Sequence, residues 1–414
     1  MSSSVLSGEQ ALAAALRNAQ TNVKFSPQIG LIALVPDRWR GIWMTRHQVV
    51  DRLARHFDVV WIETARHWRE VWGPGRTREE IVQEVTPACI VYDPGPWLPE
   101  LYRPAWLRDL IRRTRIRKAL RILEKRGCKR IVLYLWRPEF AWALDTIDAD
   151  LTCYHIDDEY TFKPEQPNDP AEIALIRRVD EVIVHSRRLM EKKGKINPNT
   201  VCVPNGVDYK AYSTHRPEPQ DLRQIPHPRM GYVGVVKAQL DLALLWELAH
   251  QHPQWSFVIV GPHGYLGDKA AWLDRLAALA NVHLLGNRAV ADLPAYVQNL
   301  DVCLMPYEIN DYTNFIYPLK LHEYLATGRP VVARSIDALV PFGDVVHLAD
   351  TVDEWQQALV TALDPQANTG PAVAGRQARA REYDWDSLVA RIADRIRQGI
   401  QSKSEQGARQ ECWR

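Results

Sequence analysis

The sequence predicts an α/β protein built from two domains, each with a doubly wound parallel sheet. Continuous apolar runs such as IGLIALV (29–35) and WSFVIVG (255–261) are typical of strands buried on both faces. Segments with helical periodicity, such as 44–57, separate most of these runs. The alternation starts a second time near residue 229, and 414 residues exceed what one hydrophobic core usually supports. We therefore expect two successive α/β units.

The domain boundary is expected within the segment 204–228, which is rich in Pro, Gly, Asn and Asp and is typical of a linker. We place one Rossmann-like domain at 26–205 and the second at 206–385. A C-terminal helix at 386–400 is expected to pack back on the first domain. The chain ends are expected to be tails, at 1–25 and 401–414. Two such domains facing each other leave a central cleft, bordered by the carboxyl ends of both sheets, where ligands bind.

Composition excludes several classes of function. A net charge of +2 does not favour nucleic acid as a partner, and six scattered cysteines without CxxC spacing suggest no zinc site. The N-terminus lacks the basic and apolar pattern of a secretory signal, and no apolar run is long enough to span a bilayer. We expect a cytoplasmic protein, or one that lies on the inner face of the cytoplasmic membrane.

The segment YPLKLHEYLATGRPVVA (317–333) carries the clearest chemical pattern. Pro318 suits the first turn of a helix, whose free N–H groups and dipole form an anion site. Lys320 adds a positive charge there, and Glu323, one turn later, can accept hydrogen bonds from the two hydroxyls of a ribose. The spacing therefore fits a grip on a nucleoside diphosphate. The alternative is an exposed Lys–Glu pair on an ordinary crossover helix.

This segment resembles the donor-binding signature of GT-B glycosyltransferases, particularly the large family 4 group. The matching positions are Pro318, Lys320, Glu323, Tyr324, Ala326, Gly328, Pro330, Val331 and Val332. VPNGVD (203–208), GYVGVV (231–236) and NVHLLG (281–286) are similar to other family segments in order and spacing. CYHIDDEY (153–160) resembles bacterial polysaccharide transferases of the teichuronic-acid type. The resemblance implies an acceptor-side first domain and a donor-binding second domain.

The resemblance also assigns the donor site residue by residue. It implies that Lys320 contacts the donor phosphates and that Glu323 contacts the ribose. The glycine-rich turn with Gly234 would approach the phosphates, with Lys237 as a second cation or, alternatively, a solvated loop residue. The remaining donor-site candidates implied are Asn287 and Arg288 near the base, and Asn314 and Pro318 before the lysine.

One position departs from the family pattern. Retaining members often carry a glutamate eight residues before the ribose-binding one, and Phe315 stands there. This leaves the donor sugar open and weakens the expectation of retention, which we still prefer to inversion. A literal Asp-x-Asp motif at Asp148 and Asp150 precedes a strand rather than following one, so we expect no metal and no other cofactor.

The first domain supplies the other candidates. His155, Asp157 and Asp158 follow a predicted strand and are the expected catalytic groups, with Asp157 as general base if the enzyme inverts. Alternatively, His155 is a satisfied strand-end histidine and the acids cap the next segment. Arg46 and His47, at the start of a helix, are acceptor-side candidates or packing residues of the loop.

The stretch 101–130 contains about a dozen lysines and arginines and only two acids, Asp109 and Glu124. Its apolar positions start at Trp106 and then drift around the helix, so they form no single amphipathic stripe. The stretch either docks on anionic lipid or covers the first sheet as a solvated helix.

The leading hypothesis is a transferase that moves sugar from a nucleotide-diphosphate donor to a glycan, expected to be lipid-linked, in surface polysaccharide synthesis. The alternatives are a nucleotide-sugar epimerase of the same fold and a non-catalytic scaffold that binds nucleotide sugar.

Overall fold

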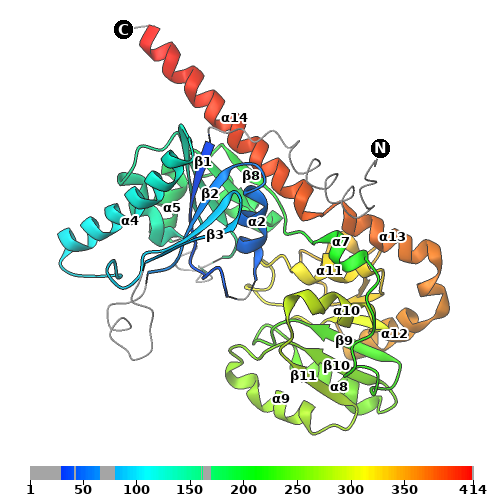
Figure 1. Ribbon diagram of the computed structural model, residues 1–414. Coiled ribbons are helices and arrows are strands. Elements are labelled where there is room, and N and C mark those ends of the chain that lie inside the picture. The colour runs from blue at the N-terminus through cyan, green and yellow to red at the C-terminus, as the bar shows by residue number, and fades with distance from the viewer. Residues whose placement is uncertain (1–28, 42, 66–79, 160, 162–168, 413–414) are drawn as a thin grey trace, which may run out of the picture. The chain divides into compact units, whose positions relative to one another are not determined.

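The structure is a computed structural model that describes residues 29–41, 43–65, 80–159, 161 and 169–412 (Figure 1). It contains two separate sheets whose strands run almost entirely parallel, with helices between successive strands. The predicted α/β class and the two parallel-sheet bodies are therefore confirmed. The predicted N-terminal tail at 1–25 lies outside the described residues.

The chain divides into two compact units. Unit 1 comprises Met1–His155, Arg178–Glu181 and Ile392–Arg414. Unit 2 comprises Ile156–Arg177 and Val182–Arg391.

The first sheet contains eight strands in the order β3-β4-β2-β1-β5-β6-β7-β8. β3 pairs antiparallel with β4, whereas β1 pairs parallel with both β2 and β5. The chain moves outward from β1 through β2 and β4, then returns to the other side of β1 through β5, so the order reverses between β1 and β5. The strands are β1 (Ile29–Leu34), β2 (Asp58–Ile62), β3 (Ile81–Thr86), β4 (Cys89–Asp93), β5 (Arg130–Leu135), β6 (Leu151–Ile156), β7 (Glu181–Val184) and β8 (Thr200–Cys202).

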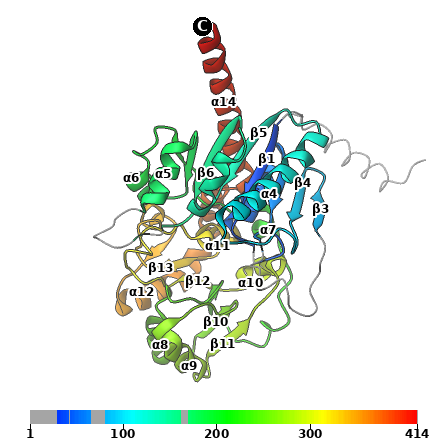
Figure 2. The ribbon, with the colours of Figure 1, turned by 90° about the vertical axis from the view of Figure 1, so that its left-hand side faces the viewer.

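Amphipathic helices accompany these strands. In α4 (Ala105–Lys125), Leu123 is fully buried and lies against β1, where a Cβ added to Gly30 would come within 2.8 Å of its Cδ1 atom. Figure 2 shows α4 in front of β1. The other helices along this part of the chain are α2 (Thr45–Leu53), η1 (Pro138–Asp145), α5 (Pro170–Arg178) and α6 (Arg187–Lys193).

The second sheet lies entirely in unit 2 and has six parallel strands in the order β11-β10-β9-β12-β13-β14. Its order reverses between β9 and β12, and apolar strands such as SFVIV in β10 are buried along their whole length. The strands are β9 (Arg229–Val233), β10 (Ser256–Val260), β11 (Val282–Gly286), β12 (Val302–Met305), β13 (Val331–Ala333) and β14 (His347–Leu348).

The helices of the second half include a long C-terminal one. α14 (Trp385–Cys412) continues past the helix expected at 386–400 into the predicted tail, where Gln, Lys, Glu, Ala and Arg all favour helix. None of the helices in the described ranges is both long and apolar enough to cross a bilayer. The others are α7 (Tyr209–Ser213), α8 (Leu242–Gln251), η2 (Gly267–Lys269), α9 (Ala270–Ala277), η3 (Val290–Asp292), α10 (Leu293–Gln298), α11 (Leu319–Thr327), η4 (Val340–Phe342), α12 (Val352–Leu363), η5 (Pro365–Asn368) and α13 (Gly370–Arg381).

Candidate functional site

The candidate site lies at the carboxyl edge of the second sheet, where the strand order reverses. In open α/β sheets, ligands bind at this switch point. Gly234 follows β9 with φ at +150°, and its amide N–H donates to the Val260 carbonyl at 2.7 Å. Gly261 follows β10 with φ at +143°, and a Cβ there would come within 2.1 Å of the Gly234 oxygen. Glycine at both positions therefore lets two turns pack with bare backbone beside the switch point.

Lys320 reaches this bare backbone from α11. Pro318 stands at the N-cap of that helix, and Gly328 ends it in the left-handed conformation with φ at +78°. A Cβ on Gly234 would lie 2.0 Å from Lys320 Cε, so the lysine side chain lies directly over the glycine. Its Nζ atom lies 5.4 Å from the centre of the Tyr232 ring. The ammonium group is thus held at the switch point, on the first turn of a helix, where an anion is favoured.

Glu323 lies one turn beyond Lys320 and is partly buried. Burial raises the pKa of its carboxyl group, an effect that Lys320 and a hydrogen bond from the Tyr212 hydroxyl oppose. Tyr212 comes from α7, so the carboxylate is positioned by a residue more than a hundred positions earlier in the chain. A carboxylate in this setting can accept further hydrogen bonds from ligand hydroxyl groups. The sequence signal for Tyr212 is weak, because nothing in its neighbourhood relates it to Glu323.

Lys237, Asn287 and Arg288 are the other donor-site candidates on the turns of the second sheet. Lys237 and Asn287 are exposed. The Arg288 guanidinium is bonded to the Asp221 carboxylate at 2.7 Å and to the Tyr296 hydroxyl at 2.8 Å. Its side chain therefore braces the chain, which leaves the backbone of this turn as the part that could face a ligand.

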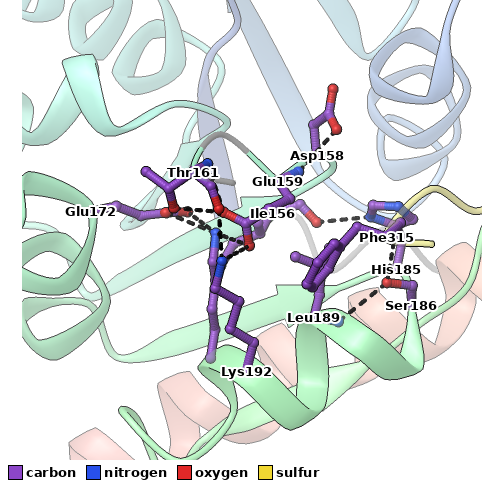
Figure 3. Close-up of polar contacts among 11 residues, drawn as sticks. Ile156, Asp158, Glu159, Thr161, Glu172, His185, Ser186, Leu189, Lys192 and Phe315 are labelled. Atoms are coloured by element: carbon purple, nitrogen blue, oxygen red, sulfur yellow. Dashed lines mark hydrogen bonds and ion pairs between the residues drawn. The ribbon is translucent and has the colours of Figure 1, made fainter. Parts of the chain in front are cut away.

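The loop 308–317 leads into α11 and contains both Asn314 and Phe315. The Ser186 hydroxyl donates to the Phe315 carbonyl at 3.1 Å (Figure 3), and the Asn205 amide donates to the Tyr317 carbonyl at 2.8 Å. Lys192 Nζ lies 5.1 Å from the centre of the Phe315 ring. These contacts, all within unit 2, position the loop that carries Phe315.

Asp157 and Asp158 lie beside the same loop. Both are half-buried. Burial raises the pKa of Tyr312 to about 12, and the negative charges of Asp158 and Asp157 add to the increase, which places the two carboxylates near the Tyr312 hydroxyl. The Asp158 carboxylate accepts the Glu159 amide N–H at 2.9 Å. The carboxylates of Asp157 and Asp158 therefore lie next to the loop that carries Phe315.

Glu159 anchors this acidic segment through a buried charge cluster. Its carboxylate lies 3.1 Å from Lys192 Nζ (Figure 3). It also lies 3.2 Å from Lys193 Nζ, and Lys193 contacts the Glu172 carboxylate at 2.8 Å. Burial by itself would raise the pKa of Glu159, but Lys193, the hydrogen bonds from Thr161 and Lys192 bring it below the ordinary value. No local sequence pattern indicates this cluster, because its members come from three separate segments.

The candidates in unit 1 have extensive contacts of their own. His155 is buried, stacks on Trp136 with ring centres 4.1 Å apart, and shares a 2.8 Å hydrogen bond between Nδ1 and the Tyr134 hydroxyl. Arg46 is buried and pairs with Asp37 at 2.5 Å.

His47 fits the interpretation as a packing residue of the loop. Its Nδ1 accepts the Met44 N–H at 3.2 Å, which leaves Nε2 as the donor to the Arg38 carbonyl at 2.9 Å. Burial lowers the pKa of this histidine, which keeps it neutral.

Comparison with known proteins agrees with this geometry. Residues 227–365, which include α11 and both glycine turns, match the family model described as glycosyl transferases group 1. A Bacillus subtilis (strain 168) protein named "Putative teichuronic acid biosynthesis glycosyltransferase TuaH" is 34% identical over 174 residues. That match covers 40% of this chain and 43% of the relative, so the chain spans less than half the length of the curated protein it matches.

Two solved structures are similar over nearly the whole chain. One is an E. coli structure described as trehalose-6-phosphate bound with UDP-2-fluoro glucose, with a TM-score of 0.65 and 12% identity. It covers 90% of this chain and 99% of its own. The other is Anabaena HepE in complex with UDP and glucose, with a TM-score of 0.64 and 16% identity, covering 90% and 100%. The likeness shows the GT-B fold and confirms the predicted fold class.

Proposed function

We propose that this chain, whose residues 227–365 match group 1 glycosyl transferases on a GT-B fold, moves a sugar from a nucleotide-diphosphate donor to a glycan hydroxyl. The B. subtilis relative is named for teichuronic acid biosynthesis, which supports a role in polysaccharide synthesis. We propose in addition that the acceptor glycan is a lipid-linked intermediate of bacterial surface polysaccharide. The observation that carries the proposal is the Lys320 side chain lying over Gly234, with Glu323 one turn behind it.

The proposed reaction breaks the bond between the sugar and the diphosphate and forms a bond to the acceptor oxygen, whose proton must be removed. Negative charge grows on the leaving diphosphate as its bond to the sugar breaks. The Lys320 ammonium group and the N–H groups of the first turn of α11 would stabilise that charge, so the proposal needs no metal ion. Glu323 would hold the ribose hydroxyls, and the turns at Gly234 and Asn287 would approach phosphate and base through their backbone.

The donor sugar would be held differently from enzymes that carry a carboxylate at the Phe315 position. Asp157 and Asp158 are the acidic groups next to the loop 308–317, and we propose that they contact the sugar instead. We propose retention of configuration at the sugar, with His155 as the other expected catalytic group. Of the two acceptor-side candidates, Arg46 remains proposed for that role, because both ring nitrogens of His47 are bonded within its own loop.

The test is thermal-shift binding of UDP, GDP, ADP and CMP to the wild type, Lys320→Met and Glu323→Ala. A ligand that binds only the folded state raises the melting temperature. One diphosphate should stabilise the wild type, and each substitution should weaken its binding about tenfold to a hundredfold, as expected for a lost charged hydrogen bond. Lys195→Met and Glu191→Ala, at exposed positions, are the matched controls.

The outcomes separate the competing functions. If no nucleotide stabilises the wild type, or if both substitutions bind as well as their controls, the donor site is not at α11. If a diphosphate binds but the corresponding nucleotide sugar is isomerised without any acceptor, the chain is an epimerase. Binding with neither transfer nor isomerisation across a set of glycan acceptors would favour the scaffold.

A further inference from the structure

Helix α4 has an outward face that the packing of unit 1 leaves uncovered. The buried apolar side chains of the helix are Ile111, Ile116, Ala119 and Leu123, and the Arg115 side chain is buried beside them. They recur every three to five residues, so they define the inner side of the helix. The apparent drift of the apolar pattern in the sequence therefore has a simple cause, because Trp106 and Leu110 belong to the opposite side.

The outward face joins an apolar end to a basic end. Trp106, Leu110, Arg113, Arg117 and Arg121 follow one another at intervals of three or four residues, which places them along one stripe of the helix. Trp106 is 67% exposed and Leu110 is 51% exposed, although both are large apolar side chains. We call these five residues the α4 stripe.

More aromatic surface lies in the segment just before the helix. Trp97 is 77% exposed and Tyr102 is 68% exposed. Arg115 donates to the Leu98 carbonyl at 2.9 Å, and Arg112 contacts the Glu100 carboxylate at 2.8 Å. These bonds hold residues 98–100 against α4, and the exposed Trp97 and Tyr102 flank those residues along the chain.

The basic end differs from the rest of α4 in its direct ion pairs, although Asp109 lies near enough to Arg113 to interact with its charge. Neighbouring cations of α4 are paired, as Arg108 is with Asp109 and Arg112 with Glu100. By contrast, across the part of the chain that the structure describes, the three arginines of the stripe form no ion pair. Arg113, Arg117 and Arg121 thus present three positive charges to the solvent.

We propose that the α4 stripe is a docking surface for an anionic phospholipid bilayer. Tryptophan and tyrosine favour the membrane–water interface, and arginines beside them attract anionic headgroups. Exposed apolar side chains and arginines on the same stripe combine insertion at the interface with attraction to anionic headgroups. Docking would bring the enzyme to a membrane-bound acceptor. The inference itself rests on α4 and does not need the proposed reaction.

The experiment is co-sedimentation of the full chain with vesicles of phosphatidylcholine alone and of phosphatidylcholine mixed with phosphatidylglycerol. The wild type should sediment with the mixed vesicles and should bind little to vesicles of phosphatidylcholine alone. R113Q/R117Q/R121Q should reduce the partition about 100-fold, at about fivefold for each arginine. W106A/L110A should also reduce it, and the binding that persists at high salt should fall most in this variant, because salt screens charges but not apolar contact.

The control variant K210Q/R216Q/R223Q loses the same three charges at exposed positions of unit 2. It should bind like the wild type, and melting curves should show that all variants are folded. Equal sedimentation of wild type with both vesicle types, or equal loss in the control, would overturn the proposal. Retention on single-stranded RNA without binding to mixed vesicles would also overturn it. The nucleotide-binding test described above is read without vesicles, so failure of one proposal leaves the other intact.

Discussion

Glu323 and Glu159 are two carboxylates of the same unit, and burial is the largest influence on the pKa of each, yet the two pKa values move in opposite directions. Glu159 has two lysines within 3.2 Å and hydrogen bonds from Thr161, and its pKa falls. Glu323 has Lys320 and one tyrosine, and its pKa rises.

The number of compensating groups, rather than burial, distinguishes a structural carboxylate from one suited to a ligand. The polar capacity of Glu159 is used within the protein, where the group anchors the segment that carries Asp157 and Asp158. Glu323 has fewer partners than a buried charge requires, and ligand hydroxyl groups can supply the rest. Lys193 and Lys320 differ in the same way. Lys193 contacts the carboxylates of Glu159 and Glu172, whereas the Lys320 side chain lies over the backbone of Gly234.

The largest effect should come from Lys193→Met. The substitution leaves the carboxylates of Glu159 and Glu172 facing each other without their shared cation, and breaking a buried pair in this way costs roughly 3–5 kcal/mol. Denaturant titration should show this loss, while Lys195→Met, an exposed lysine two residues later, should be neutral. Lys320→Met should cost clearly less than Lys193→Met. Equal losses of stability in Lys193→Met and Lys320→Met would contradict the distinction between a structural lysine and one suited to a ligand.

An intermediate effect is expected for Gly234→Ala. The new Cβ would lie 2.0 Å from Lys320 Cε, and a non-glycine residue at φ of +150° is strained. Strained backbone costs about 1–3 kcal/mol, and Lys320 must also move away from the switch point. Denaturant titration should detect the lost stability, and diphosphate binding should weaken as in Lys320→Met. Gly375→Ala is the control, since no atom lies near its added Cβ within α13. Unchanged nucleotide affinity in Gly234→Ala would show that the position of Lys320 does not matter.

The smallest effect is a pH dependence of opposite sign in two glutamine variants. Folding raises the pKa of Glu323, so the free energy of unfolding of the wild type falls as pH rises above 4.5. Over that range, Glu323→Gln should become more stable relative to the wild type. Folding lowers the pKa of Glu159, so its contribution is present above pH 4.5 and disappears as pH falls below it. Glu159→Gln should therefore be less stable than the wild type near neutrality, with the gap closing in acid.

Each pH unit between the folded and unfolded pKa corresponds to about 1.4 kcal/mol in these profiles. Unfolding free energies of the wild type and of both variants, measured from pH 3 to pH 8, would give both curves. Parallel curves for Glu323→Gln and Glu159→Gln would contradict the comparison.

Local patterns were enough to predict much of the fold. The buried strands are short apolar runs, and α11 is bounded by Pro318 and Gly328, which act on their own neighbours. The hairpin strand β3 was not predicted, because its residues are largely exposed and IVQEVT alternates only weakly. β14 was not predicted either, because its two residues form a strand only through pairing with β13.

By itself, the sequence determined the α/β class, the two parallel sheets and the one-turn spacing of Lys320 and Glu323, because each depends on residues close together in the chain. Only the tertiary structure decided that Lys320 lies over Gly234, that Tyr212 bonds Glu323, and that Lys193 joins Glu159 to Glu172. It also decided which side of α4 faces the solvent. These contacts join segments from 21 to more than a hundred residues apart, and periodicity within one segment carries no information about what lies opposite it.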